Sequence, residues 1–277
     1  MDPLVSTQWL AGELGQPDLT IVDASWHMPA TGRSAADEFR DSHIPGARFL
    51  DLDALSDTSH PAPHMLPTAA VFGQAMEALG VGQGDRILVY DNSPLRTAVR
   101  GWFMLRHFGA DKVAILDGGL GKWLAEGRPT QSGEATPRRT RFAAAERADD
   151  VIDKQAILAG PDGPLLDARG AARFEGSEPD PRQGVAPGHI PGSRNLAFAA
   201  LYREDGTFHS IDEIGRLFAD AGVDPARPFV ATCGSGVTAN SLIFAAHLLG
   251  NRSALLYDGS WGEYGADPAT PKVLGPA

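Results

Sequence analysis

Cys233 is the only cysteine among the 277 residues, and its surroundings could support chemistry. A short apolar stretch precedes it, Gly234 and Gly236 enclose Ser235, and an apolar run with helical spacing follows. A free cysteine is often only a small buried side chain. A glycine-containing loop between a strand and a helix, however, can direct backbone N–H groups and the positive end of the helix toward the sulfur. Both effects stabilise a thiolate, so we expect Cys233 to be a nucleophile.

Two chemistries use a thiolate in a loop of this kind. Phosphoester hydrolysis needs an arginine that closes the loop and holds the phosphate oxygens. The stretch CGSGVTA, from Cys233 to Ala239, contains neither arginine nor lysine. In sulfur transfer, by contrast, the thiolate attacks an electrophilic sulfur and becomes a persulfide. The neutral loop therefore favours sulfur transfer over phosphate chemistry.

The loop at Cys233 lies in the second copy of an internal repeat. The stretch HIPGARFLDLDAL begins at His43, and HIPGSRNLAFAAL begins at His189. Three further pairs occur in the same order, each about 140 residues apart: TIVDAS and PLLDAR, RILVYDNS and PFVATCGS, LDGGLGKW and YDGSWGEY. Four pairs in register indicate two copies of one unit. Because His43 and His189 recur in both copies, a structural role explains them better than a catalytic one.

Each copy alternates short apolar runs with helical patterns. The runs TIVDA, RILVYD and KVAILDG in the first copy, and PLLDA, PFVATC and SALLYDG in the second, are typical of buried strands. AVRGWFMLRHFG and SLIFAAHLLG have helical spacing and end in glycine, a usual helix stop. We therefore predict two similar α/β domains, each a parallel sheet flanked by helices, over residues 1–128 and 151–277. A polar linker over residues 129–150 would join them.

The composition argues against several partners and locations. A formal net charge of −11 argues against nucleic acid and anionic membranes, which need a basic face. The N-terminal stretch lacks the basic and apolar regions of a signal peptide, and no apolar run reaches the roughly 18 residues of a membrane span. A single cysteine fits a reducing compartment, so we expect a cytoplasmic protein. We also expect no metal and no organic cofactor, because no motif with the required spacing occurs.

The chain resembles the tandem-domain sulfurtransferases of the rhodanese superfamily, over nearly its whole length from Leu4 to Tyr264. The motifs HMLP, EPDPRQG, GHIPG, YDGSW and CGSGVT carry the resemblance. The loop CGSGVT is similar to that of the members that use 3-mercaptopyruvate as sulfur donor. Members that use thiosulfate typically have a basic loop, close to Cys-Arg-Lys-Gly-Val-Thr. The resemblance implies a catalytically silent N-terminal domain, and Asp91 stands where the first copy would carry its cysteine.

The resemblance also implies which residues hold the substrate. Arg173 and Arg182 match substrate-binding arginines, and arginine binds carboxylates by paired hydrogen bonds. The loop residues expected to contact the substrate are Gly234, Gly236, Val237 and Thr238.

A proton relay is implied as well. Ser235, His64 and Asp53 match a serine–histidine–aspartate relay, with His60 as the competing histidine. The relay would protonate the enolate that departs when sulfur leaves 3-mercaptopyruvate.

Three activities are compatible with the sequence. The resemblance implies sulfur transfer from 3-mercaptopyruvate through a Cys233 persulfide to a thiol such as thioredoxin, or to cyanide. Thiosulfate is the alternative donor, although a dianion should favour a basic loop. The third possibility is a non-catalytic carrier whose persulfide a partner enzyme loads.

Overall fold

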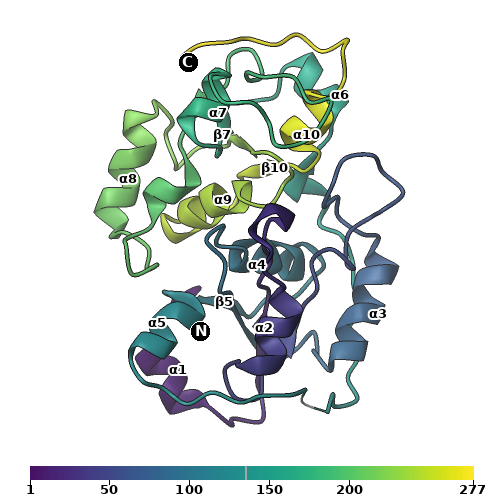
Figure 1. Cartoon of the computed structure of the whole chain (residues 1–277), viewed down its shortest axis with the longest axis vertical. Helices are drawn as coiled ribbons and strands as arrows, with labels where there is room; N and C mark the ends of the chain where they lie inside the picture. Colours follow the sequence, from purple (N-terminus) through teal and green to yellow (C-terminus); the bar gives the residue numbers. More distant parts are fainter. Residues whose placement is uncertain (135) are drawn as a thin grey trace. The chain divides into compact units, whose positions relative to one another are not determined.

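The computed structural model describes residues 1–134 and 136–277, which form two compact units (Figure 1). Unit 1 consists of Met1–Ser56, Leu66–Arg147 and Arg203–Phe208, and unit 2 of Asp57–Met65, Ala148–Tyr202 and His209–Ala277. The units follow the two copies of the repeat, except that each contains one short segment from the sequence of the other copy. Ala135, in the predicted linker, lies outside the described residues.

The described residues of unit 1 form a five-stranded parallel sheet in the order β1-β5-β4-β2-β3. The strands are β1 (Leu4–Val5), β2 (Leu19–Asp23), β3 (Arg48–Phe49), β4 (Arg86–Tyr90) and β5 (Val113–Leu116). In the pair β2 and β4, Leu19 aligns with Arg86 and Asp23 with Tyr90. Residues Ile87 to Tyr90 are all buried, as expected of a strand that helices cover on both faces.

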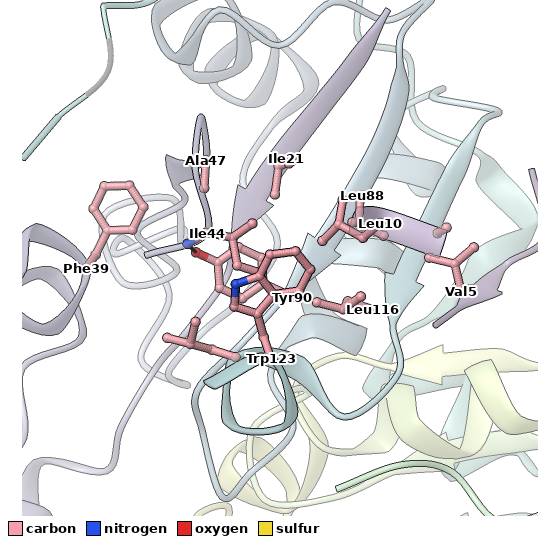
Figure 2. Packing of buried hydrophobic residues seen from close by; sticks show 12 residues of the cluster. Val5, Leu10, Ile21, Phe39, Ile44, Ala47, Leu88, Tyr90, Leu116 and Trp123 are labelled. Carbon is pink, nitrogen blue, oxygen red and sulfur yellow. Dashed lines mark hydrogen bonds between the residues drawn. The ribbon is translucent and has the colours of Figure 1, made fainter. Parts of the chain in front are cut away.

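The helices of unit 1 are α1 (Thr7–Glu13), η1 (Pro29–Thr31), α2 (Ala35–Asp41), α3 (Ala69–Leu79), α4 (Ala98–His107) and α5 (Gly119–Ala125). Leu88 and Tyr90 belong to a buried cluster on one face of the sheet (Figure 2). Three helices contribute to this cluster, with Leu10 from α1, Phe39 from α2 and Trp123 from α5. Val89 points to the opposite face, where Gly101 lets α4 approach closely.

Unit 2 repeats this topology. Its described residues form a five-stranded parallel sheet in the order β6-β10-β9-β7-β8, which is the order of unit 1 copied strand for strand. The strands are β6 (Val151–Ile152), β7 (Leu165–Asp167), β8 (Arg194–Asn195), β9 (Val230–Thr232) and β10 (Leu255–Tyr257). Two similar α/β units with parallel sheets are confirmed, and the identical strand order supports the duplication.

The helices of unit 2 are η2 (Ala148–Asp150), α6 (Lys154–Ala159), α7 (Ala171–Glu175), η3 (Phe198–Leu201), α8 (Ile211–Asp220), α9 (Ala239–Leu248) and α10 (Ser260–Tyr264). Residues 239–247 of α9 are all buried, so this helix is a core element. Val230 and Tyr257 pack with Trp261 in the buried cluster of unit 2. No helix among the described residues has both the length and the apolar character needed to cross a membrane.

Most of the predicted linker packs as part of unit 1. Phe142 is buried, with its ring centroid 5.6 Å from that of Phe72 in α3. Its backbone N–H also donates to Glu77 Oε1 at 3.1 Å. The chain therefore passes into unit 2 at Ala148, two residues before the predicted end of the linker.

The two repeated histidines make equivalent contacts. The Nδ1 of His43 donates to the carbonyl oxygen of Phe39 at 2.7 Å, and that of His189 donates to the carbonyl oxygen of Phe174 at 3.0 Å. Each ring also stacks on the same phenylalanine that it contacts. Both histidines are buried, which agrees with a structural role.

Candidate active site

Cys233 lies directly after β9, at the carboxyl end of the central strand of unit 2. Only 1% of its surface is exposed. Residues 234–238 form the loop between β9 and α9, and the helix begins at Ala239. The sulfur therefore lies at the end of a buried strand, next to the N-terminus of a buried helix, as the sequence predicted.

The shape of this loop depends on Gly236 and Asn240. Gly236 has φ +71°, and a Cβ there would lie 2.6 Å from the carbonyl oxygen of Asp258, so only glycine fits. The side-chain N–H₂ of Asn240 donates to the carbonyl oxygens of Gly236 and Val237, at 2.7 and 3.0 Å. In a trans peptide the N–H points opposite to the C=O. The N–H groups of Val237 and Thr238 therefore point away from Asn240.

Ser260, the first residue of α10, supports the loop from a second element. Its Oγ accepts hydrogen bonds from the backbone N–H groups of Cys233 and Gly236, both at 3.1 Å, and lies 3.9 Å from Cys233 Sγ. The N–H of Gly236 therefore has a protein acceptor, and the contact of Gly236 with the substrate stays a prediction. Ser260 has φ +50°, a strained backbone for a residue with a side chain.

Sequence reasoning missed the role of Ser260, although a comparison of the two copies of the repeat singles out this position. When LDGGLGKW is aligned with YDGSWGEY, Ser260 takes the place of Gly119. Gly119 has φ +55°, so both copies need a left-handed backbone at this position. Unit 1 uses glycine there at no steric cost, whereas unit 2 keeps a serine whose hydroxyl contacts the loop.

The two predicted arginines converge on the residue after the cysteine. A Cβ on Gly234 would lie 2.9 Å from Nη2 of Arg182 and 3.2 Å from Nη2 of Arg173. Nη1 of Arg182 also donates to the carbonyl oxygen of Gly234. About a quarter of each arginine side chain is exposed, so both side chains are partly accessible beside Cys233.

Asp180 holds both arginines, and sequence reasoning assigned it no role. Oδ1 accepts from Nε of Arg182 at 2.7 Å. Oδ2 accepts from Nη2 of Arg182 at 2.8 Å and from Nη2 of Arg173 at 2.7 Å. Burial alone would raise the pKa of Asp180, but the hydrogen bonds and charge of Arg182, together with Arg173, lower it to about 2.

The structure also brings Ser235 and His64 together. Nδ1 of His64 lies 2.9 Å from Ser235 Oγ, within hydrogen-bond distance. His64 has φ +60°, so its backbone is strained. His60, the competing histidine, instead faces Glu263 in α10, with 3.8 Å between Nε2 and Oε1. The geometry therefore favours His64 as the partner of Ser235, and its catalytic role stays a prediction.

Asp53 belongs to unit 1, whereas Ser235 and His64 belong to unit 2. The Asp53 side chain is exposed, and its Oδ1 accepts a hydrogen bond from the indole Nε1 of Trp26 at 2.9 Å. The indole thus orients the Asp53 carboxylate, whose part in the relay remains a prediction from the resemblance.

Unit 1 contains a counterpart of the loop, with Asp91 in place of the cysteine. The buried carboxylate of Asp91 accepts from the backbone N–H groups of Ser93 and Ala98, both at 2.8 Å. Burial raises the pKa of Asp91. One amide of this loop and the first amide of α4 are therefore bound to a side chain of the loop itself.

Among the described residues, no group of three or more histidine, cysteine, aspartate or glutamate side chains is arranged to hold a metal ion.

The fold and this site define a family. The model of the rhodanese-like domain matches the chain twice, over residues 6–126 and 145–267, and the chain belongs to this family. It is 42% identical over 270 residues to the 3-mercaptopyruvate sulfurtransferase of Rattus norvegicus, covering 94% of this chain and 91% of that one. It is also 38% identical over 272 residues to the thiosulfate sulfurtransferase of the same organism, again covering 94% and 91%.

A solved structure agrees with these relatives. The crystal structure of SseA from Escherichia coli, described as showing the rhodanese fold and catalytic mechanism of 3-mercaptopyruvate sulfotransferases, matches with a TM-score of 0.86 at 38% identity. The match covers 94% of this chain and 99% of that chain, so the likeness extends over both units.

Proposed function

We propose that this chain is a sulfurtransferase that takes sulfur from 3-mercaptopyruvate onto Cys233. The position of Arg173 and Arg182 carries the proposal, because both guanidinium groups reach Gly234, directly beside the cysteine. Two arginines can hold the carboxylate and the adjacent ketone of 3-mercaptopyruvate by hydrogen bonds. The loop itself is neutral, and this favours a carboxylate donor over a dianion.

In the first half-reaction the Cys233 thiolate attacks the donor sulfur. An S–S bond forms and the S–C bond breaks, and the carbon keeps the bonding electrons as an enolate of pyruvate. That carbon takes up one proton, and the donor thiol releases one proton as the persulfide ionises. Protons and electrons therefore balance without an oxidant or reductant.

Ser235 and His64 are proposed to deliver the proton to the enolate. A hydroxyl bound to a histidine can give up its proton and recover one from the imidazole. The 2.9 Å distance between the two side chains supports this step. Asp53 is proposed to orient His64, and the N–H groups of Gly234, Val237 and Thr238 to contact the bound donor and the persulfide.

In the second half-reaction an acceptor attacks the outer sulfur of the persulfide, and the Cys233 thiolate is restored. We propose a thiol acceptor such as thioredoxin, which the cytoplasm keeps reduced, or cyanide, which would leave as thiocyanate.

Mass spectrometry tests the enzymatic proposal against a passive carrier. The purified protein is mixed with 3-mercaptopyruvate alone, and we expect one additional sulfur on Cys233 and an equal amount of released pyruvate. The Cys233→Ser variant should show neither. If the wild-type protein forms no adduct, or if the variant turns over, the enzymatic proposal is wrong.

Thiosulfate is the second candidate donor, because the chain is also 38% identical to a thiosulfate sulfurtransferase. Measuring kcat/KM for each donor with cyanide as common acceptor decides between them. We expect a clear preference for 3-mercaptopyruvate, and a preference for thiosulfate would reverse the donor assignment.

A further inference from the structure

Three charged side chains form one hydrogen-bonded group, and the two arginines of this group lie beside Gly234, next to the reactive sulfur. Arg173 and Arg182 each bring one positive charge, and Asp180 lies between them with only 2% of its side chain exposed. Asp180 is ionised at neutral pH, because its two arginine partners lower its pKa despite its burial. The group of three therefore has a net charge of +1.

This net charge matters for the two candidate donors. At neutral pH 3-mercaptopyruvate carries one negative charge, on its carboxylate, and thiosulfate carries two. Two unit charges a few ångströms apart interact strongly in a partly buried site. The group of three can neutralise a monoanion fully, whereas a bound dianion leaves one negative charge without a counterpart.

We propose that Asp180 determines which donors the site accepts, by cancelling one arginine charge and so favouring a singly charged donor over a doubly charged one. The inference rests on the proposed function and assigns a residue to its donor preference. The buried Asp258 beside the loop and the N-terminus of α9 act on both donors as well, but neither changes when Asp180 is replaced.

A purely structural role for Asp180 predicts a different result. If Asp180 only fixed the two arginines in place, its loss would weaken the binding of both donors, since both use the same guanidinium groups. The values of kcat/KM would fall together and their ratio would stay constant. The ratio of kcat/KM for thiosulfate to that for 3-mercaptopyruvate therefore separates the charge of Asp180 from its positioning.

The test is the Asp180→Asn variant, which keeps one oxygen acceptor and raises the local charge by one unit. Both donors are measured with cyanide as acceptor, because in ping-pong kinetics kcat/KM for the donor reports only the donor half-reaction. We expect the ratio to rise by about tenfold or more. Asp224→Asn is the matched control: Asp224 is exposed, precedes the amino end of β9, and its Oδ1 acceptor is retained by asparagine. The control should leave the ratio unchanged.

A second variant moves the charge in the other direction. Arg173→Gln removes one positive charge and leaves Asp180 paired with Arg182, so the ratio should fall below the wild-type value. If Asp180→Asn fails to fold, this variant still tests the premise of the proposal, that the net charge of the group of three sets the ratio. The proposal is overturned if Asp180→Asn leaves the ratio constant, or if Arg173→Gln leaves it constant or raises it.

The role of Asp180 and the proposed function are tested by different measurements, so one can be rejected without the other. The wild-type ratio alone decides which donor the enzyme prefers. The change in that ratio between the wild type and Asp180→Asn decides the role of Asp180, whichever donor the wild type prefers.

Discussion

At the scale of single residues, the pairing of Ser235 with His64 has the clearest consequence. Their side chains lie 2.9 Å apart, and they come from positions 171 residues apart in the chain. The strained backbone of His64 costs folding free energy, and other interactions must offset this cost to hold the imidazole ring beside Ser235. Such strain is common at functional sites, and the proton role that we propose for the pair would account for it.

Ser235→Ala should therefore slow pyruvate release more than it slows persulfide transfer. The first half-reaction needs a proton at carbon, while an acceptor that attacks the persulfide does not. We expect a loss of about 100-fold in single-turnover pyruvate formation, in the usual range for general acid catalysis. Preloaded enzyme mixed with cyanide should lose less than about threefold. Equal losses in the two half-reactions would contradict a donor-side proton role.

Ser260 leads to a prediction about stability. Ser260→Ala leaves the buried N–H groups of Cys233 and Gly236 without their acceptor while the strained backbone remains, so we expect a loss of about 1–3 kcal/mol. Ser260→Gly loses the same acceptor but relieves the strain of φ +50°, and it should be more stable than the alanine variant by about 1 kcal/mol. Thermal unfolding of the two variants checks this order. An alanine variant as stable as the glycine variant would show that the backbone is not strained.

At the scale of elements, the strand–loop–helix units after β4 and β9 have the same construction. The backbone N–H of Leu120 donates to the carbonyl oxygen of Asp91 at 3.0 Å, and that of Trp261 donates to the carbonyl oxygen of Cys233 at the same distance. The two loops differ in the side chain at their first position. In unit 1 the carboxylate of Asp91 accepts from the backbone N–H groups of Ser93 and Ala98, whereas in unit 2 the position holds a thiol and Ser260 accepts from two amides.

Asp91 should accordingly stabilise unit 1 without taking part in catalysis. Asp91→Ala leaves the N–H groups of Ser93 and Ala98 unpaired in the interior, at a cost of about 1–3 kcal/mol. Asp91→Asn keeps one oxygen and should lose less. Thermal unfolding measures both, and kcat/KM for 3-mercaptopyruvate is the accompanying readout, expected within about twofold of wild type at 25 °C. Wild-type stability in the alanine variant would show that these hydrogen bonds contribute nothing.

At the scale of the whole molecule, two kinds of feature can be predicted from the sequence: those that repeat along the chain, and those that depend on adjacent residues. Matching stretches revealed the duplication and the parallel sheets, and the loop at Cys233 could be interpreted from adjacent residues. The neighbours of the site could not be found this way, because contacts between distant segments depend on packing. The segment Asp57–Met65 lies in the sequence of the first copy but belongs to unit 2. Asp180 likewise resembles any aspartate until its burial and both arginine partners are known.

The duplication also provides an internal comparison at the ends of β2 and β7. Asp23 and Asp167 occupy equivalent positions, and both are buried. Two residues later unit 2 has Arg169, whose Nη2 lies 2.6 Å from Oδ2 of Asp167, while unit 1 has Ser25. Burial, opposed mainly by hydrogen bonds from Ser25, raises the pKa of Asp23 to about 6. The aspartate at this position is therefore costly to ionise in unit 1, whereas in unit 2 the positive charge of Arg169 compensates its negative charge.

The same substitution should therefore have opposite effects in the two units. The folded pKa of Asp23 lies above its unfolded value, so the wild type loses stability as the pH rises through 6. Asp23→Asn should stabilise the protein by up to about 3 kcal/mol at pH 8 and by only about 0.5 kcal/mol at pH 4, where Asp23 is mostly protonated in the folded state. Asp167→Asn should instead cost about 3–5 kcal/mol at pH 8, because the buried Arg169 loses its counter-charge. Calorimetric unfolding at the two pH values measures both variants. A gain for Asp23→Asn that is as large at pH 4 as at pH 8 would show that ionisation of Asp23 is not its cause.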